Sequence, residues 1–242
     1  MELQNSYWWF KSALSDNDCN DIIDLGKKVI RENKENNIDV AGTTFGDNHK
    51  QAVDKDSISL EDKTLAESKD KKTYVRDSEV SFLDYDWLYD IITPYVYGAN
   101  KKAGWNYDID YHETPQFTVY NSPGGFYGWH SDGNSDHHAK YKRLVPGFTE
   151  NDKQHTKNHN WVGKIRKLSM TINLSEPGSY EGGNLKFDYG PHIKGERYHE
   201  CTEIRPKGSV IVFPSYLYHQ VTPVTKGTRY SLVMWSLGHP FR

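Results

Sequence analysis

The stretch GSVIVFPSYLYHQVTPVTKGTRYSLVMWSLG, residues 208–238, indicates the fold most clearly. β-Branched and aromatic side chains alternate with other side chains in short runs, and Gly and Pro separate these runs, as in consecutive strands. Seven short strands that follow two helices predict a mainly β, α+β protein in which antiparallel sheets close into a jelly-roll barrel. Working backwards, the same texture recurs in WNYDIDY (105–111), TPQFTVYN (114–121), RKLSMTINLSE (166–176), GGNLKFDY (182–189) and HECTEIRP (199–206).

Two helices are predicted ahead of these strands. Ser15 is a good N-cap for the first helix, and acidic residues follow it in the first turn, where the helix dipole favours them. An extended aromatic segment precedes this helix, and the alternation in YVRDSEVSFL, residues 74–83, predicts one strand after it. Apolar residues recur at helical intervals over 85–102, and Pro94 within that run predicts a kink or an early end.

We expect residues 1–242 to form a single domain. Residues 1–104 would be an N-terminal support region whose helices pack on the larger sheet, with a long polar loop over 33–72. Residues 105–242 would be the jelly-roll core, with an insertion over 133–164 that is rich in His, Lys, Asn and Asp.

Composition argues against several classes of protein. Lys and Arg number 30 and Asp and Glu 33, so the chain lacks the basic excess of most nucleic-acid-binding proteins. Cys19 and Cys201 are too few for a disulfide framework. The first residues lack the basic cap and apolar run of a signal peptide, and no stretch approaches the roughly 18 apolar residues of a membrane span. We therefore expect a cytoplasmic protein without a nucleic-acid or membrane partner.

Two segments carry side chains suited to metal binding. YNSPGGFYGWHSDGN, residues 120–134, contains His130 and Asp132, which point to the same side if a strand runs through them. His219 follows at the end of an apolar run. Two imidazoles and one carboxylate form the ligand set of non-haem iron(II) sites, which leaves coordination positions open. Because His-x-Asp alone is common by chance, the hypothesis depends on His219 and on an arginine beyond it.

That arginine is Arg229, ten residues past His219. Strand alternation places Arg229, Ser231 and Trp235 on one face of the last strand. An arginine inside a small barrel is costly unless an anion pairs with it, and a carboxylate fits its planar guanidinium, with the Ser231 hydroxyl adding a hydrogen bond.

The order of these residues resembles the prolyl 4-hydroxylase-like branch of the Fe(II)/2-oxoglutarate-dependent dioxygenases. The resemblance covers roughly residues 114–237 and includes the segment GGNL. It implies a double-stranded β-helix, a cupin-like jelly roll, in which His130, Asp132 and His219 are the catalytic iron ligands. It further implies that Arg229 binds the remote carboxylate of 2-oxoglutarate.

The resemblance also implies roles around these ligands. Tyr120 would contact the cosubstrate and Trp235 would lie near the pocket. Either Thr171 or Asn173 would help to hold the remote carboxylate, and the residues do not decide between the two. The aromatic rim formed by Phe126, Tyr127 and Trp129 could receive an apolar ring of the substrate.

The implied activity is hydroxylation of an aliphatic C–H bond, most favourably on a peptidyl proline, with release of succinate and carbon dioxide. Fe(II), 2-oxoglutarate and dioxygen would be required, and ascorbate is a candidate further cofactor. The partner would be a peptide, a protein or a small molecule. Alternatives are a dioxygenase of a free amino acid or small metabolite, a metal-binding module without turnover and, more weakly, a hydrolytic zinc site. Nucleic-acid dealkylases of the superfamily carry a second arginine where this chain has Trp235, and this difference argues against a nucleic-acid substrate.

Overall fold

The computed structural model describes residues 5–40, 76–132, 163–190 and 196–241. Most of the predicted insertion over 133–164 and most of the predicted loop over 33–72 therefore lie outside the described residues. The elements in chain order are β1 (Trp8–Phe10), α1 (Asp16–Glu35), β2 (Arg76–Asp77), β3 (Glu79–Phe82), α3 (Asp86–Lys102), β4 (Tyr111–His112), β5 (Gln116–Asn121), β6 (Phe126–His130), β7 (Ile165–Asn173), β8 (Tyr180–Gly182), β9 (Leu185–Asp188), β10 (Tyr198–Glu200), a 3-10 helix (Thr202–Ile204), β11 (Val210–Pro214), β12 (Tyr218–Val221) and β13 (Val224–Gly238).

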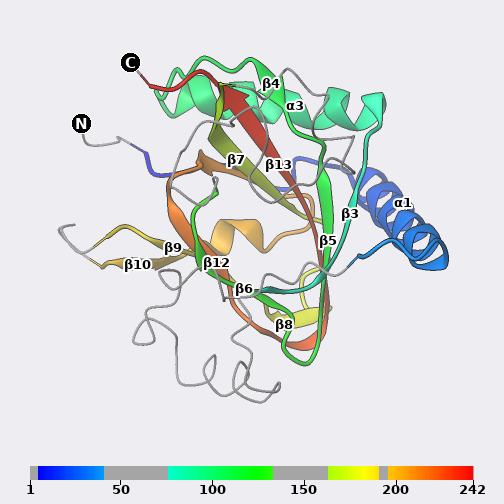
Figure 1. The fold of residues 1–242 in the computed structure, drawn as a ribbon. Coiled ribbons are helices and arrows are strands. Elements are labelled where there is room, and N and C mark those ends of the chain that lie inside the picture. The colour runs from blue at the N-terminus through cyan, green and yellow to red at the C-terminus, as the bar shows by residue number, and fades with distance from the viewer. Residues whose placement is uncertain (1–4, 41–75, 133–162, 191–195, 242) are drawn as a thin grey trace.

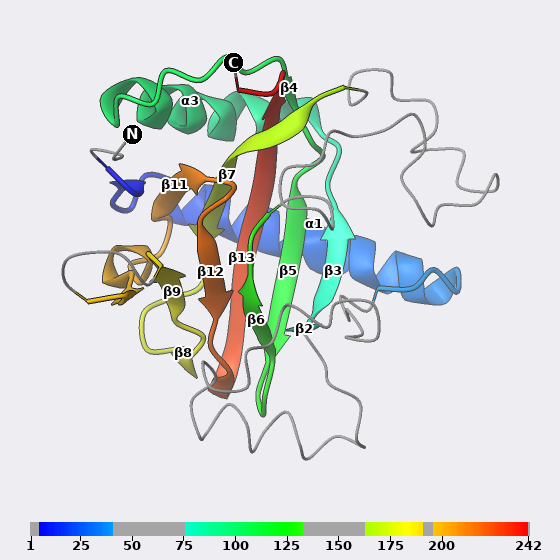
Figure 2. The same cartoon turned by 60° about the vertical axis from the view of Figure 1, so that its left-hand side comes forward.

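Two antiparallel sheets form the barrel, and both helices cover the outer face of the larger one (Figures 1 and 2). The larger sheet has eight strands in the order β1-β11-β7-β13-β5-β3, with β4 and β8 also paired to β13. The smaller sheet has the order β10-β9-β12-β6-β2. This arrangement confirms the predicted α+β jelly roll with helices packed on the larger sheet. No helix in the described part of the chain is long and apolar enough to cross a membrane.

Helix α1 begins at the predicted cap. The Ser15 side chain accepts a hydrogen bond from the Asp18 backbone N–H at 3.1 Å, and the Asp18 carboxylate accepts one from the Ser15 backbone N–H at 3.1 Å. These reciprocal bonds satisfy N–H groups that have no partner within the helix. The helix continues to Glu35, three residues into the segment expected to be a loop. Its buried face, at a spacing of three and four residues, lies against β3 and β5.

Helix α3 runs without interruption through Pro94 to Lys102, so the predicted early end is wrong. Proline removes one backbone hydrogen bond from a helix. Leu88, Ile92 and Val96 offset this loss because they are fully buried against the larger sheet, and tertiary packing supplies most of the stability of a helix in a folded protein.

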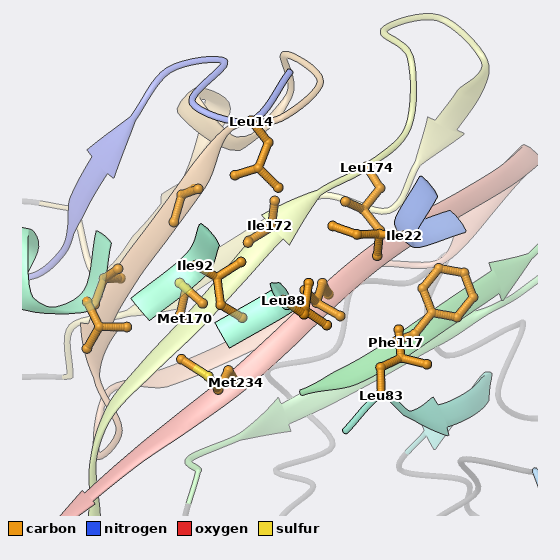
Figure 3. Packing of buried hydrophobic residues seen from close by; sticks show 14 of the residues in the cluster. Leu14, Ile22, Leu83, Leu88, Ile92, Phe117, Met170, Ile172, Leu174 and Met234 are labelled. Carbon is orange, nitrogen blue, oxygen red and sulfur yellow. The ribbon is translucent and has the colours of Figure 1, made fainter. Parts of the chain in front are cut away.

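The main hydrophobic core lies between the two helices and the larger sheet (Figure 3). Ile22 of α1 and Ile92 of α3 meet side chains of three neighbouring strands, among them Phe117, Met170 and Met234. Each such side chain contributes about 1.5–3 kcal/mol when it is fully buried. The packed helices therefore support the larger sheet as a rigid layer, and this support fixes the positions of the residues on the opposite face of the sheet.

Three of the predicted strands differ from the structure. Residues 105–111 are irregular except at Tyr111, which opens β4. The run 199–206 leaves β10 for a 3-10 helix, because Cys201 and Ile204 are both buried and a spacing of three residues suits that helix. The single strand predicted over 74–83 is divided, since β2 pairs with β6 in the smaller sheet and β3 pairs with β5 in the larger one.

The close contact of α1 with β5 can be tested at Gly26. A Cβ atom there would lie 2.3 Å from Cδ1 of Phe117, whose ring is fully buried. We expect Gly26→Ala to lower the free energy of unfolding by about 1–3 kcal/mol, as overpacking does, although Ala favours helices. Gly98 of α3 is the control, because its Cβ would lie 3.4 Å from the Phe10 ring. Gly98→Ala should be neutral or stabilising by up to about 1 kcal/mol. If urea denaturation showed the same loss in the free energy of unfolding for Gly26→Ala and Gly98→Ala, the close contact of Gly26 with Phe117 would be contradicted.

A second prediction concerns pH and His112 of β4. Its ring nitrogens are hydrogen-bonded to the Ser236 hydroxyl at 2.9 Å and the Tyr97 hydroxyl at 3.0 Å, and burial lowers its pKa to about 4. Between about pH 6.5 and pH 4 the unfolded chain binds a proton here that the folded chain does not, so stability falls as the pH drops. His112→Gln should remove this part of the pH dependence. Parallel stability curves for the wild type and the variant across that range would contradict the prediction.

Candidate metal and carboxylate site

The pairing of β6 with β12 brings together the three predicted metal ligands. His130 and His219 are direct partners across the two strands, and Asp132 lies two residues beyond His130, just past the end of β6. One ligand atom from each residue lies within 4.8 Å of the others. Asp132 Oδ1 is 3.7 Å from His130 Nε2, and Asp132 Oδ2 is 3.6 Å from His219 Nε2.

Hydrogen bonds to backbone carbonyls orient both imidazole rings. His130 Nδ1 lies 2.7 Å from the Gly128 carbonyl oxygen, and His219 Nδ1 lies 2.9 Å from that of Leu217. A carbonyl oxygen only accepts, so each Nδ1 donates its proton to the carbonyl, and Nε2 is the ring nitrogen turned toward Asp132. Such a bond on the far nitrogen is the usual support of a metal-binding histidine. The two Nε2 atoms and the Asp132 carboxylate therefore form a ligand set that fits a divalent cation.

The charge states also suit a cation. Burial, reinforced by the neighbouring His219, lowers the pKa of His130 to about 3, so this imidazole is neutral at pH 7. Burial raises the pKa of Asp132, but His219, His130 and Arg166 together outweigh it and hold that pKa below its usual range. A neutral imidazole and an ionised carboxylate are the forms that bind metal, so His130 and Asp132 are both in the form that a cation needs.

Aromatic rings hold the two histidines in place. The Tyr127 ring stacks on His130 with a centroid distance of 3.5 Å and an interplanar angle of 15°. The Phe213 ring meets His219 edge-on at 4.7 Å. Phe213, Leu185 and Val221 add apolar surface to the pocket around the cluster. Small-molecule sites commonly combine such apolar walls with a few polar groups that converge.

Arg229 faces the same pocket from β13 of the larger sheet. Only 1 % of the residue is exposed, its Nη1 donates a long 3.4 Å hydrogen bond to the Ser231 hydroxyl, and its buried Nε has no partner. Within the described part of the chain no carboxylate pairs with this guanidinium. Gly183 makes room for it, because a Cβ there would lie 2.9 Å from Arg229 Cδ. A buried and unpaired guanidinium is costly unless an anion completes it, so this part of the pocket suits a carboxylate.

The other predicted residues divide clearly. Tyr120, Thr171, Ser231 and Trp235 all line the pocket. Asn173 does not line it, because its side-chain amide donates to the Ser175 and Arg205 carbonyl oxygens at 3.1 and 2.9 Å.

Of the predicted aromatic rim, Tyr127 lines the pocket, whereas Phe126 and Trp129 are not among its lining residues. Arg76, which was not predicted as a site residue, also lines the pocket. Its place in the alternating run 74–83 was the available signal, but alternation alone does not say which face of a strand is turned inward.

Comparisons with known proteins agree with this geometry. A model of the 2OG-Fe(II) oxygenase superfamily matches residues 115–237. A PKHD-type hydroxylase of Nitrobacter winogradskyi is 42 % identical over 69 residues, which cover 28 % of this chain and 27 % of that protein. Another, from Bordetella pertussis, is 34 % identical over 124 residues, which cover 50 % of this chain and 42 % of that protein. The aligned stretches thus span less than half the length of these relatives.

Solved structures with the same fold include prolyl hydroxylases. The viral collagen prolyl hydroxylase of Paramecium bursaria Chlorella virus-1, in complex with 2-oxoglutarate, has a TM-score of 0.55 at 18 % identity and covers 97 % of both chains. A Pseudomonas putida prolyl-4-hydroxylase has a TM-score of 0.55 at 15 % identity and covers 96 % of this chain and 93 % of its own. At these identities the likeness concerns the fold alone. The superfamily match, by contrast, takes in half of the sequence, from β5 to near the end of β13, and the chain therefore belongs to the 2OG-Fe(II) oxygenase superfamily.

Proposed function

We propose that this protein is an Fe(II)- and 2-oxoglutarate-dependent oxygenase that hydroxylates an aliphatic C–H bond, with a peptidyl proline as the favoured substrate and succinate and carbon dioxide as products. One observation carries the proposal: the buried, unpaired Arg229 shares a pocket with the cluster of His130, Asp132 and His219. A cation site and a carboxylate site side by side suit a metal that is chelated by a 2-oxo acid. Membership of the superfamily and the names of the related hydroxylases support the same activity.

Each residue has a distinct task in this proposal. His130 and His219 hold iron through Nε2, and Asp132 holds it through its carboxylate. Arg229, with the Ser231 hydroxyl, binds the remote carboxylate of 2-oxoglutarate. When bound, iron would bind and activate dioxygen, and 2-oxoglutarate would supply the electrons for this as it is oxidised to succinate and carbon dioxide. The protein supplies ligands, orientation and a pocket from which water is excluded, where charge interactions are stronger than in water.

We further propose that residues 1–242 form a single domain, because one core cluster includes side chains of α1, α3 and the barrel strands. The burial of Arg229 speaks against a metal-binding module without cosubstrate, which has no need of a buried guanidinium. A free amino acid or small metabolite is the alternative to a peptide substrate. The cytoplasmic location stays a prediction.

The first test concerns the carboxylate site. Binding of 2-oxoglutarate, measured by calorimetry without oxygen, should require Mn(II) or Fe(II). Arg229→Gln should weaken it by at least about 10- to 100-fold, the loss of one charge-assisted hydrogen-bonded pair. The affinity of Arg229→Lys for 2-oxoglutarate should lie between those of the wild type and Arg229→Gln, because lysine keeps the charge but lacks the planar guanidinium. Arg205→Gln is the control, since Arg205 lies outside the pocket lining. Unchanged affinity in Arg229→Gln would refute the assigned role.

The second test concerns the metal site. Asp132→Asn keeps the shape of the side chain but removes its negative charge. We expect Mn(II) to raise the melting temperature of the wild type but not of this variant, because binding to the folded state alone stabilises it. Release of succinate from 2-oxoglutarate should be lost as well. A metal-induced stabilisation of the same size in Asp132→Asn would place the metal elsewhere.

A further inference from the structure

A second buried guanidinium, that of Arg76, lines the pocket that contains the His130–Asp132–His219 cluster. Arg76 belongs to β2 at the edge of the smaller sheet, where it is the direct partner of Tyr127 in β6. Only 8 % of the residue is exposed. Its guanidinium carbon lies 4.8 Å from the centre of the Tyr127 ring, and that ring stacks on His130 at 3.5 Å. Arg76 therefore lies one aromatic ring away from a proposed metal ligand.

Among the described residues, Arg76 makes its hydrogen bonds to uncharged groups. Its Nε donates to the Ser78 hydroxyl at 2.8 Å, and its Nη2 donates to the Thr118 hydroxyl at 3.4 Å. No carboxylate in the described residues forms an ion pair with it. Arg166, which stacks on Trp235 of the pocket, differs in this respect, because it donates to both carboxylate oxygens of Glu113, at 2.6 and 2.5 Å. The charge of Arg166 is thus balanced by Glu113, whereas no carboxylate of the described residues balances the charge of Arg76.

A count of the charges in the site with iron(II) and 2-oxoglutarate bound also distinguishes Arg76 from the other arginines. Iron(II) and the dianion of 2-oxoglutarate cancel each other, Asp132 cancels Arg229, and Glu113 cancels Arg166. Among the described residues of the pocket, one positive charge, that of Arg76, is then left, and burial makes an unpaired charge costly. A single negative charge on the substrate would complete the site.

We propose that Arg76 binds a carboxylate of the substrate, so that the protein oxidises a C–H bond a few bonds away from a negative charge. This inference rests on the proposed function and narrows its substrate class. A monoanion fits better than a phosphate dianion, because one guanidinium faces the site and the excess is one charge. The carboxylate has two possible sources, an acidic side chain beside the oxidised residue or the free carboxylate of a terminal residue.

Paired ligands that differ only in this charge test the inference. Glycyl-proline and glycyl-prolinamide probe a terminal carboxylate, and acetyl-prolyl-aspartate amide and acetyl-prolyl-asparagine amide probe a side chain. Each is titrated by calorimetry into protein loaded with Mn(II) and saturating 2-oxoglutarate, which keeps the ligands out of the Arg229 site. In at least one pair we expect the acid to bind at least about 10-fold more tightly than the amide to the wild type. Arg76→Gln should reduce this ratio to within about 2-fold.

Two further variants make the result specific. Arg205 stacks on Tyr180 at 4.5 Å much as Arg76 stacks on Tyr127, but it does not line the pocket, so Arg205→Gln should keep the full ratio. Arg76→Lys should still prefer the acid to the amide, but by a ratio that is severalfold smaller, because lysine keeps the charge and lacks the planar guanidinium. This variant carries the test if Arg76→Gln does not fold.

Three results would overturn the inference: an undiminished ratio in Arg76→Gln, no preference for the acid in either pair with the wild type, or a loss of 2-oxoglutarate affinity in Arg76→Gln as large as in Arg229→Gln. Failure of the proposed function has a separate signature. The wild type would then bind no 2-oxoglutarate in a metal-dependent way, whichever paired ligand is present, and both conclusions would fall.

Discussion

The antiparallel pairing of β6 with β12 is the constraint on which the site depends. It sets His130 opposite His219, and each histidine is then oriented by the carbonyl of the residue two positions before it. A slip of one residue in this pairing would turn one imidazole to the other face of the sheet. The ladder of β12 with β9 resists such a slip, because it fixes His219 opposite Phe187, whose side chain is fully buried.

The pocket lies between two sheets with different tasks. The larger sheet is held from behind by α1 and α3, and its strand β13 pairs with four others, so Arg229 is carried by the best-supported strand of the fold. The smaller sheet carries His130, His219 and Arg76, and Asp132 follows its strand β6. The Asp132 carboxylate and the two guanidinium groups thus line one buried pocket, where their interactions are strong because little water screens them.

Much of the fold could be predicted from local patterns. The Ser15 capping box and the alternation in β5, β7, β11 and β13 depend on neighbours in sequence, and the structure confirms them. The local predictions were wrong where contacts between segments far apart in the sequence determine the structure. Residues 74–83 alternate as one strand, yet their two halves join different sheets. Pro94 is tolerated inside α3 because the helix is buried against a sheet formed elsewhere in the chain.

The sequence by itself determined the chemistry available to the pocket, because donor type and strand parity are local properties. Residue type, spacing and the family resemblance predicted His130, Asp132, His219 and Arg229, and all four line one pocket in the structure. Only the tertiary structure decided which other polar side chains face this group. Thr171 lines the pocket while Asn173, two residues away on the same strand, is bonded to backbone carbonyls, and Arg76 enters from an edge strand. The closing of two sheets around one cavity sets these positions, and no single segment encodes that closure.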